Sequence, residues 1–241
     1  MNKIKYISLL WKHNAVNNTI SCKPYSNKLT KRLFINGNNK YFNKRKNIKQ
    51  VKCYKCHRDI NVDNVPFSCQ SCKALINVDV FKIFNFFELF GFRKVSYDLD
   101  KNYLKKKFND IQKIYHPDKN AQNSELERIN EVSSYLNNAY GILLNDIDRA
   151  SYMINIQYNY KIPEDENLED EEFLSEIIKI NEQINKPEMD LLLLTREYKD
   201  KYEDHVKRIK LHFEEKDFEN IVNTLKKLKF INKILERLKN L

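Results

Sequence analysis

The chain has 241 residues, with only three Gly and five Pro, which fits one or two small, mainly helical domains with real cores and short connections. Its net charge of +10 normally suggests a nucleic-acid or membrane partner, but thirteen basic residues and no acidic residue lie in residues 1–52. Residues 53–241 then hold 30 basic and 33 acidic residues, a net charge of about −3, so the basic balance is poor support for nucleic-acid binding.

Residues 1–52 are predicted to be an organelle-targeting leader, because they lack acids and are rich in Lys and Asn. Ile4, Ile7 and Trp11 can form the apolar side of a short helix in this leader. No apolar run approaches the roughly 18 residues of a membrane span, and no signal-peptide core is present. The alternative is a merely disordered basic tail, and the small share of Arg counts against targeting. We expect a cleavable presequence and a location in the mitochondrial matrix.

Four cysteines follow in two pairs, Cys53-x-x-Cys56 and, twelve residues later, Cys69-x-x-Cys72. Each pair can hold one side of a metal ion, and a hairpin between the pairs would bring them together. Four thiolates complete the tetrahedral coordination of zinc without an open position, so a structural zinc ion is predicted. Two disulfides or a redox dithiol are the alternatives. His57 is a substitute ligand in principle, but it is expected to be a surface residue.

Three helical segments are predicted next. Residues 80–90 are dense in Phe and predict a short helix that ends at Gly91. Two longer helices follow, each with one apolar stripe at the helical period. The stripes are Leu104, Phe108, Ile111 and Tyr115 in the first helix, and Ile129, Val132, Leu136, Tyr140 and Leu143 in the second.

The tripeptide His116-Pro117-Asp118 lies between the two longer helices. Proline cannot continue a helix, and it biases the preceding residue away from helical dihedrals, so the tripeptide is predicted at the exposed tip of a helical hairpin. An isolated His-Pro-Asp is a weak signal, since a helix-breaking turn explains it equally well. Between two amphipathic helices, after Tyr115 and before Lys119, it indicates a fixed polar contact for a partner protein.

This region resembles the J-domain, the module with which DnaJ-type co-chaperones stimulate a DnaK-type (heat-shock-70) chaperone. The resemblance implies that His116, Pro117 and Asp118 bind the chaperone. Lys107 and Lys113 are expected to add electrostatic docking, although exposed lysines alone also form ordinary solvated faces. Many J-domains carry basic residues where this chain has Asn109 and Asp110. The segments that carry the resemblance are Phe84–Leu89, Leu104–Phe108, Tyr115–Lys119 and Leu136–Tyr140.

A polar, acidic stretch separates this hairpin from three further amphipathic segments, with breaks near Pro187 and near Lys216-Asp217. Three such helices form a small antiparallel bundle. Leu174 and Ile178 lie about 100–140° from the apolar arc of their own helix, and Phe230, with Ile234 one turn on, lies about 200° from Leu228. This side stripe indicates a docking patch. Packing against the hairpin, or self-association as a homodimer, is the alternative.

The order of a cysteine knuckle, a J-domain and a three-helix bundle resembles the HscB/Jac co-chaperones of iron–sulfur cluster biogenesis, over about residues 53–241. Within that family the bundle binds a cluster scaffold protein of the IscU type. The resemblance implies a scaffold-binding face at Leu174, Ile178 and Phe230, with Glu182 as a polar contributor. Ser175 stands where a larger apolar residue is usual, and Lys179 where an acid is usual. Further matching segments are Asp148–Tyr152, Glu172–Glu176 and Leu228–Lys233.

The predicted fold class is therefore mainly α, with a small zinc-knuckle hairpin, a helical J-domain hairpin and a C-terminal three-helix bundle. The expected function is that of a co-chaperone adaptor. No catalytic residues are predicted, and neither nucleic acid nor a membrane is expected among its partners. The alternatives are a zinc-containing J-protein of another pathway, such as diphthamide synthesis, and, from another class, a nucleic-acid-binding zinc protein. The predicted domains are a leader (1–52), a zinc module (53–79), a J-domain (80–158), a linker (159–168) and a bundle (169–241).

Overall fold

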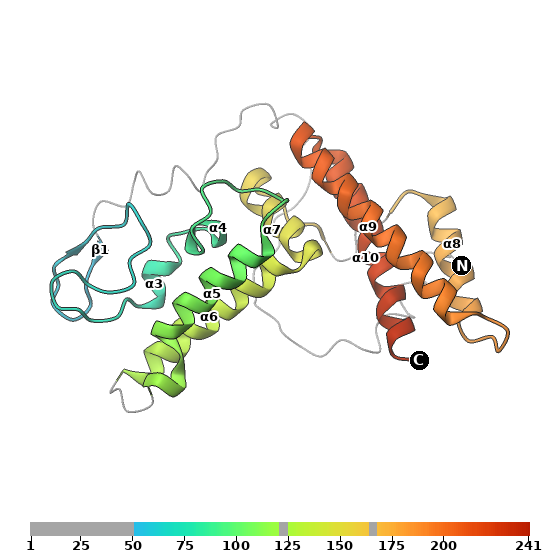
Figure 1. The fold of residues 1–241 in the computed structure, drawn as a ribbon. Coiled ribbons are helices and arrows are strands. Elements are labelled where there is room, and N and C mark those ends of the chain that lie inside the picture. Colours follow the sequence, from blue (N-terminus) through green and yellow to red (C-terminus); the bar gives the residue numbers. More distant parts are fainter. Residues whose placement is uncertain (1–50, 121–124, 164–167) are drawn as a thin grey trace. The chain divides into compact units, whose positions relative to one another are not determined.

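The computed structural model describes residues 51–120, 125–163 and 168–241, all within one compact unit of residues 38–241. Its elements are mainly helices, which confirms the predicted fold class (Figure 1). Nearly all of the predicted leader lies outside the described residues. Every helix in the described part of the chain is too short or too polar to cross a membrane.

Two small hairpins hold the cysteines. Strand β1 (Val51–Lys52) pairs antiparallel with β2 (Asp59–Ile60), so the first cysteine pair lies between them. A single antiparallel bridge between Ser68 and Leu75 encloses the second pair in the same way. The expectation of one hairpin between the two pairs was wrong, because each pair lies in the turn of its own hairpin.

The Phe-rich segment forms two short helices, α3 (Val78–Phe81) and α4 (Phe86–Leu89), rather than the single predicted helix. Asn85 accounts for the break. Its side chain accepts a hydrogen bond from the backbone N–H of Glu88, and the Glu88 carboxylate accepts one from the backbone N–H of Asn85, so a new helix starts there. Gly91 follows α4 with a φ of +76°, a left-handed conformation that glycine adopts without strain.

The predicted hairpin consists of α5 (Lys101–Tyr115) and α6 (Leu126–Leu144), which lie side by side (Figure 1). A short 3₁₀ turn, Pro117–Asn120, follows α5. The predicted stripes face the core, where all their members are buried except Phe108 and Tyr140, which stack on one another with ring centroids 4.1 Å apart. The helical hairpin is therefore built on the pattern that predicted it.

A further helix, α7 (Asp146–Tyr158), follows α6 and had not been predicted. Asn145 separates the two helices: it ends α6, and its side chain accepts hydrogen bonds from the backbone N–H groups of Ile147 and Asp148 at the start of α7. Arg149 on α7 is buried and donates to the carbonyl oxygens of Tyr97 and Leu143, at 2.8 and 2.7 Å. This buried guanidinium ties α7 to the hairpin.

The C-terminal bundle contains α8 (Glu171–Gln183), α9 (Leu191–Glu215) and α10 (Phe218–Lys239), with breaks where the sequence predicted them. Each helix begins after an aspartate whose carboxylate accepts a hydrogen bond from the backbone N–H three residues on: Asp170, Asp190 and Asp217. The buried core of the bundle includes Leu194, Tyr198 and Ile231. Tyr198 and Ile231 are fully enclosed.

Candidate functional site

The His116-Pro117-Asp118 tip begins directly after α5, whose last residue is Tyr115. Side-chain exposure is 46% for His116 and 88% for Asp118, so both polar groups are accessible. Nδ1 of His116 accepts a hydrogen bond from the backbone N–H of Asp118 at 3.2 Å. A neutral imidazole that accepts at Nδ1 carries its proton on Nε2, and so it has a donor left for a partner. The tip is thus exposed, as the sequence predicted.

Asn120 holds this tip in place, a role that had not been predicted for it. Its side-chain amide donates to the carbonyl oxygens of Ile114 and His116, at 3.0 and 2.9 Å. The backbone N–H of Lys119 also donates to the His116 carbonyl. These bonds satisfy carbonyls that the end of α5 would otherwise leave without a partner. The sequence did contain a signal for this role, because asparagine often caps helix ends and here it comes directly after His-Pro-Asp-Lys.

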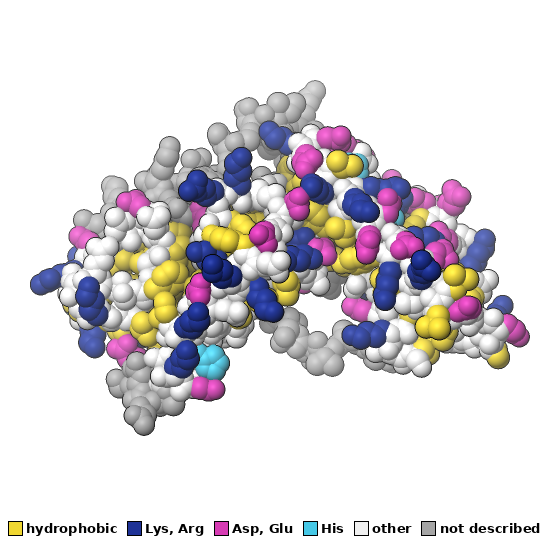
Figure 2. Space-filling model, in the orientation of Figure 1, with side chains coloured by type: hydrophobic (Ala, Val, Ile, Leu, Met, Phe, Trp, Pro, Cys, Tyr) yellow, Lys and Arg dark blue, Asp and Glu magenta, His cyan; other side chains and the backbone are white. Residues whose placement is uncertain are grey.

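Figure 2 shows Lys and Arg side chains in a row over α5. Lys105, Lys106 and Lys113 are exposed, whereas Lys107 is half-buried with its ammonium 5.3 Å from the centre of the Tyr103 ring. Lys113 pairs with Asp110 at 2.8 Å, and this hydrogen bond lowers the pKa of the Asp110 carboxyl. The face keeps an excess of positive charge next to the tip.

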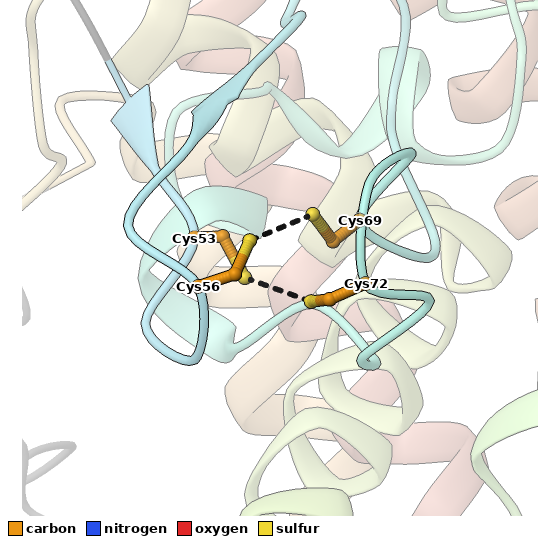
Figure 3. A group of neighbouring side chains, drawn as sticks. All are labelled: Cys53, Cys56, Cys69 and Cys72. Carbon is orange, nitrogen blue, oxygen red and sulfur yellow. Dashed lines mark hydrogen bonds between the residues drawn. The ribbon is translucent and has the colours of Figure 1, made fainter.

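The four cysteine side chains converge from the two hairpins (Figure 3). All four sulfur atoms lie within 4.8 Å of one another, with Cys53 and Cys72 separated by 3.6 Å and Cys56 and Cys69 by 3.7 Å. Four Zn–S bonds of about 2.3 Å in a tetrahedron place the sulfurs about 3.8 Å apart, whereas a disulfide needs about 2.0 Å. The cluster therefore fits a metal ion, and the two-disulfide alternative does not fit these distances.

The two knuckles have the same local geometry. The backbone N–H of His57 donates to the carbonyl of Cys53 at 2.9 Å, and that of Lys73 donates to the carbonyl of Cys69 at 3.0 Å. Both His57 and Lys73 are left-handed, with φ of 58° and 60°. Such tight turns direct backbone N–H groups at sulfur, and those of Cys72 and Ser71 lower the pKa of the Cys69 thiol to about 6. This lowered pKa favours the thiolate of Cys69, the form that binds metal, whereas burial and the neighbouring thiols raise the pKa of Cys72 to about 11.

The predicted scaffold face lies on two helices of the bundle. Leu174 and Ile178 are one turn apart on α8 and half-buried, as is Phe230 on α10, while Glu182 is exposed. The Phe230 ring packs edge-on against Phe173 with centroids 6.3 Å apart. The three apolar side chains are therefore partly accessible.

One part of the predicted side stripe was wrong. Ile234, which was grouped with Phe230 from the sequence, is fully buried in the core of the bundle. Helix α10 buries side chains towards both α8 and α9, so its buried arc is wider than the single stripe that includes Leu228. Ile231 is buried in the same core, whereas Val222 belongs to the core that also contains the hairpin residues.

Comparison with known proteins gives a consistent result. Residues 169–239 match the protein family described as the HSCB C-terminal oligomerisation domain. The "Co-chaperone protein HscB homolog" of Vibrio atlanticus is 31% identical over 159 residues, which cover 62% of this chain and 92% of that protein. The human "Iron-sulfur cluster co-chaperone protein HscB" is 29% identical over 178 residues, which cover 72% of this chain and 74% of that protein.

A solved structure has the same fold. The crystal structure of human co-chaperone protein HscB superposes with a TM-score of 0.72 at 26% identity, and the match covers 79% of this chain and 98% of that one. The arrangement of helices described above is therefore similar to that of the human co-chaperone protein.

Proposed function

The chain belongs to the HscB family of co-chaperone proteins, and on that premise we propose that it delivers an IscU-type iron–sulfur scaffold protein to a DnaK-type chaperone and stimulates the chaperone's ATPase. The observation that carries the proposal is the exposed His116-Pro117-Asp118 tip in the same chain as a bundle of the HscB type. The name of the human relative connects this architecture with iron–sulfur clusters.

The chaperone site consists of His116, Pro117 and Asp118, with Lys107 and Lys113 beside them. Its rigid turn presents a donor on the imidazole and an acceptor on the carboxylate in a fixed relation, which lowers the entropy lost on binding. The lysines favour approach to an acidic surface, and salt weakens that attraction.

The scaffold site consists of Leu174, Ile178 and Phe230, with Glu182 at its edge. These half-buried side chains offer apolar area that a partner can cover. Lys233 lies with its ammonium 5.9 Å from the centre of the Phe230 ring, and Lys179 is exposed on α8. The rim of the site is therefore partly basic, and the matching surface of the scaffold is expected to include acids.

Zinc is the metal that we assign to the four cysteines, because thiolates in a closed tetrahedron suit it and leave no position for a substrate. Cys53, Cys56, Cys69 and Cys72 would hold it. The bound ion would join two hairpins that have very few backbone hydrogen bonds of their own, so its role is structural.

The protein acts as an adaptor without a reaction of its own, and it works in the mitochondrial matrix. The location rests on the acid-free composition of residues 1–52. Fusion of these residues to a fluorescent reporter tests it: the reporter should enter mitochondria, and a reporter that stays in the cytosol rejects the location.

The ATPase of a purified DnaK-type chaperone tests the function. Hydrolysis is measured with the zinc-loaded chain, with an IscU-type scaffold, and with both together. We expect stimulation by the chain alone and a larger stimulation with both, because one molecule then holds scaffold and chaperone together. An ATPase rate that the chain leaves unchanged, with or without scaffold, rejects the proposed function.

A further inference from the structure

The metal-binding module contacts both flanks of the His-Pro-Asp tip. The first contact is made by Tyr115, the last residue of α5 and the neighbour of His116. Tyr115 is fully buried, and its hydroxyl donates to the carbonyl oxygen of Phe67 at 2.6 Å. The backbone N–H of Ile76 donates to the same hydroxyl at 3.0 Å. Phe67 and Ile76 flank the second cysteine knuckle, so this hydroxyl joins the module to the end of α5.

The Tyr115 hydroxyl also completes the second hairpin. The backbone N–H of Ile76 lies 3.3 Å from the carbonyl of Phe67, a long hydrogen bond between the two sides of that hairpin. The phenol oxygen bridges the same two groups with shorter bonds, and its ring packs edge-on against Phe81 at 5.6 Å. Hydrogen bonds to buried backbone groups are costly to lose without replacement. The hairpin and the end of α5 therefore depend on each other.

The second contact lies on the other flank, at the start of α6. Tyr54, between Cys53 and Cys56, donates its hydroxyl to the carboxylate of Glu125, the residue that precedes α6. The guanidinium of Arg128, in the first turn of α6, lies 3.6 Å from the centre of the Tyr54 ring.

We propose that the cysteine module is a positioning element for the chaperone-binding tip, with Tyr115 and Tyr54 as the residues that transmit the state of the metal site to α5 and α6. The expected effect on the chaperone rests on the proposed function, whereas the expected effect of the metal on the order of the tip does not. Each knuckle sets the path of the backbone that carries these contacts, so loss of the metal releases both flanks of His116-Pro117-Asp118. Coupling of this kind is reciprocal: contacts that the metal favours must also favour the metal.

Amide hydrogen exchange on the full chain tests this directly and needs no chaperone. Exchange is followed in residues 114–120 and 125–130 in the zinc-loaded protein and after removal of zinc with EDTA. We expect exchange in both segments to become about tenfold faster without metal, since a structural metal site is coupled to local folding. Unchanged exchange in both segments after complete zinc removal overturns the proposal.

Three phenylalanine variants separate the coupling from general damage. Tyr115→Phe and Tyr54→Phe each remove one hydroxyl that joins the cysteine module to α5 or α6. Tyr103→Phe is the control, because among the described residues its hydroxyl makes only a long hydrogen bond, of 3.4 Å, to the Gly91 carbonyl. With zinc bound, the first two variants should exchange about fivefold faster in the adjacent flank, the effect of losing one hydrogen bond. Their zinc affinity should fall by a similar factor, and the control should change neither. Equal behaviour of all three variants overturns the proposal.

Stimulation of the chaperone's ATPase then tests whether the order of the tip affects chaperone binding. Tyr115→Phe and Tyr54→Phe should require about fivefold more co-chaperone for half-maximal ATPase stimulation while they still bind zinc and scaffold. Stimulation equal to wild type despite faster exchange contradicts a role in chaperone binding. Failure of the wild-type chain to stimulate at all rejects the proposed function instead, and the exchange rates alone then decide whether the module positions the tip.

Discussion

His116 combines exposure with a fixed orientation, and this combination is what a recognition residue needs. Its Nδ1 is occupied by the backbone N–H of Asp118, and its carbonyl by Lys119 and Asn120. The ring therefore meets a partner in one orientation.

His116→Gln tests this residue. We expect chaperone stimulation to fall at least about tenfold, because glutamine cannot accept from the Asp118 N–H and keep a rigid donor in place of Nε2. Scaffold affinity and thermal stability should remain as in wild type. The matched control is His57→Asn, an exposed histidine in a left-handed position that asparagine tolerates. Equal stimulation by His116→Gln and the control contradicts the assignment of the tip.

Leu174→Ala and Phe230→Ala test the scaffold face. Each should weaken binding of an IscU-type scaffold about thirtyfold, as truncation of a central apolar contact does. Stimulation by the chain without scaffold should be unchanged. Leu192→Ala is the control, because Leu192 on α9 is 85% exposed and lies outside the proposed face. If scaffold affinity falls no further in these variants than in the control, Leu174 and Phe230 are not part of the scaffold-binding face.

Among single residues, the cysteine ligands could be predicted from their spacing, because a metal site of this kind needs only thiolates held close together by short loops. The tip could be predicted because proline acts on its own neighbours. The role of Tyr54 could not, since Tyr54 contacts Glu125 across 71 residues and the two side chains meet only in the folded chain. The role of Asn120 could have been, because its partners lie only four and six residues before it.

Among the elements, the long helices were predictable and the short ones were not. The stripes of α5 and α6 extend over several turns, so the period is unambiguous. The split between α3 and α4 depends on one capping residue, Asn85, inside a continuous apolar run. Helix α7 was missed because its buried positions include a polar one, Arg149, which a hydrophobic pattern does not count.

The cap of α8 has a measurable electrostatic component. Lys227 on α10 donates to the Asp170 carboxylate, and together with the N–H of Phe173 it lowers the pKa of that carboxyl. A lowered pKa stabilises the fold above the unfolded value of about 3.9, and this contribution disappears as the pH falls through the folded value. The Asp170 side chain is 34% exposed, so the pair contributes at most about 1 kcal/mol.

Asp170→Asn keeps a capping group but removes the charge, so it should lower the free energy of unfolding at pH 7 by up to about 1 kcal/mol. The difference from wild type should become smaller as the pH falls below the unfolded value of about 3.9 and vanish only below the lowered pKa of the folded state. Lys227→Gln should cause a similar loss, and the double variant should lose little more than either single variant. Denaturant unfolding at pH 7 and pH 3 measures this, and fully additive losses would contradict a direct pair.

The two hairpins of the cysteine module contain few backbone hydrogen bonds, so they depend on the bound ion. Cys56→Ser should reduce the zinc content from about one ion per chain to almost none, because three thiolates no longer close the tetrahedron. His57→Asn should retain the metal. Atomic absorption on both purified variants decides the point: full zinc content in Cys56→Ser, or loss in His57→Asn, would show that the ligand set is wrong.

For the whole molecule, the two proposed binding surfaces lie on one chain. A continuous core of buried side chains includes Cys53, the hairpin residues Leu104 and Leu136, and Leu225 on α10, while the α8 end of the bundle has a second core of its own. The tip follows Tyr115, which lies in the first core, and Phe230 of the proposed scaffold face packs against the second. Simultaneous binding raises the effective concentration of scaffold at the chaperone without any new contact.

The central claim is that a single chain must hold both partners. The direct measurement is the scaffold-dependent part of the chaperone's ATPase, compared between the wild-type chain and an equimolar mixture of His116→Gln with the double variant Leu174→Ala/Phe230→Ala, at a concentration where light scattering shows monomers. The account predicts strong scaffold-dependent stimulation by the wild type and none by the mixture, since no molecule in the mixture has both surfaces intact. A mixture that restores wild-type stimulation would contradict it.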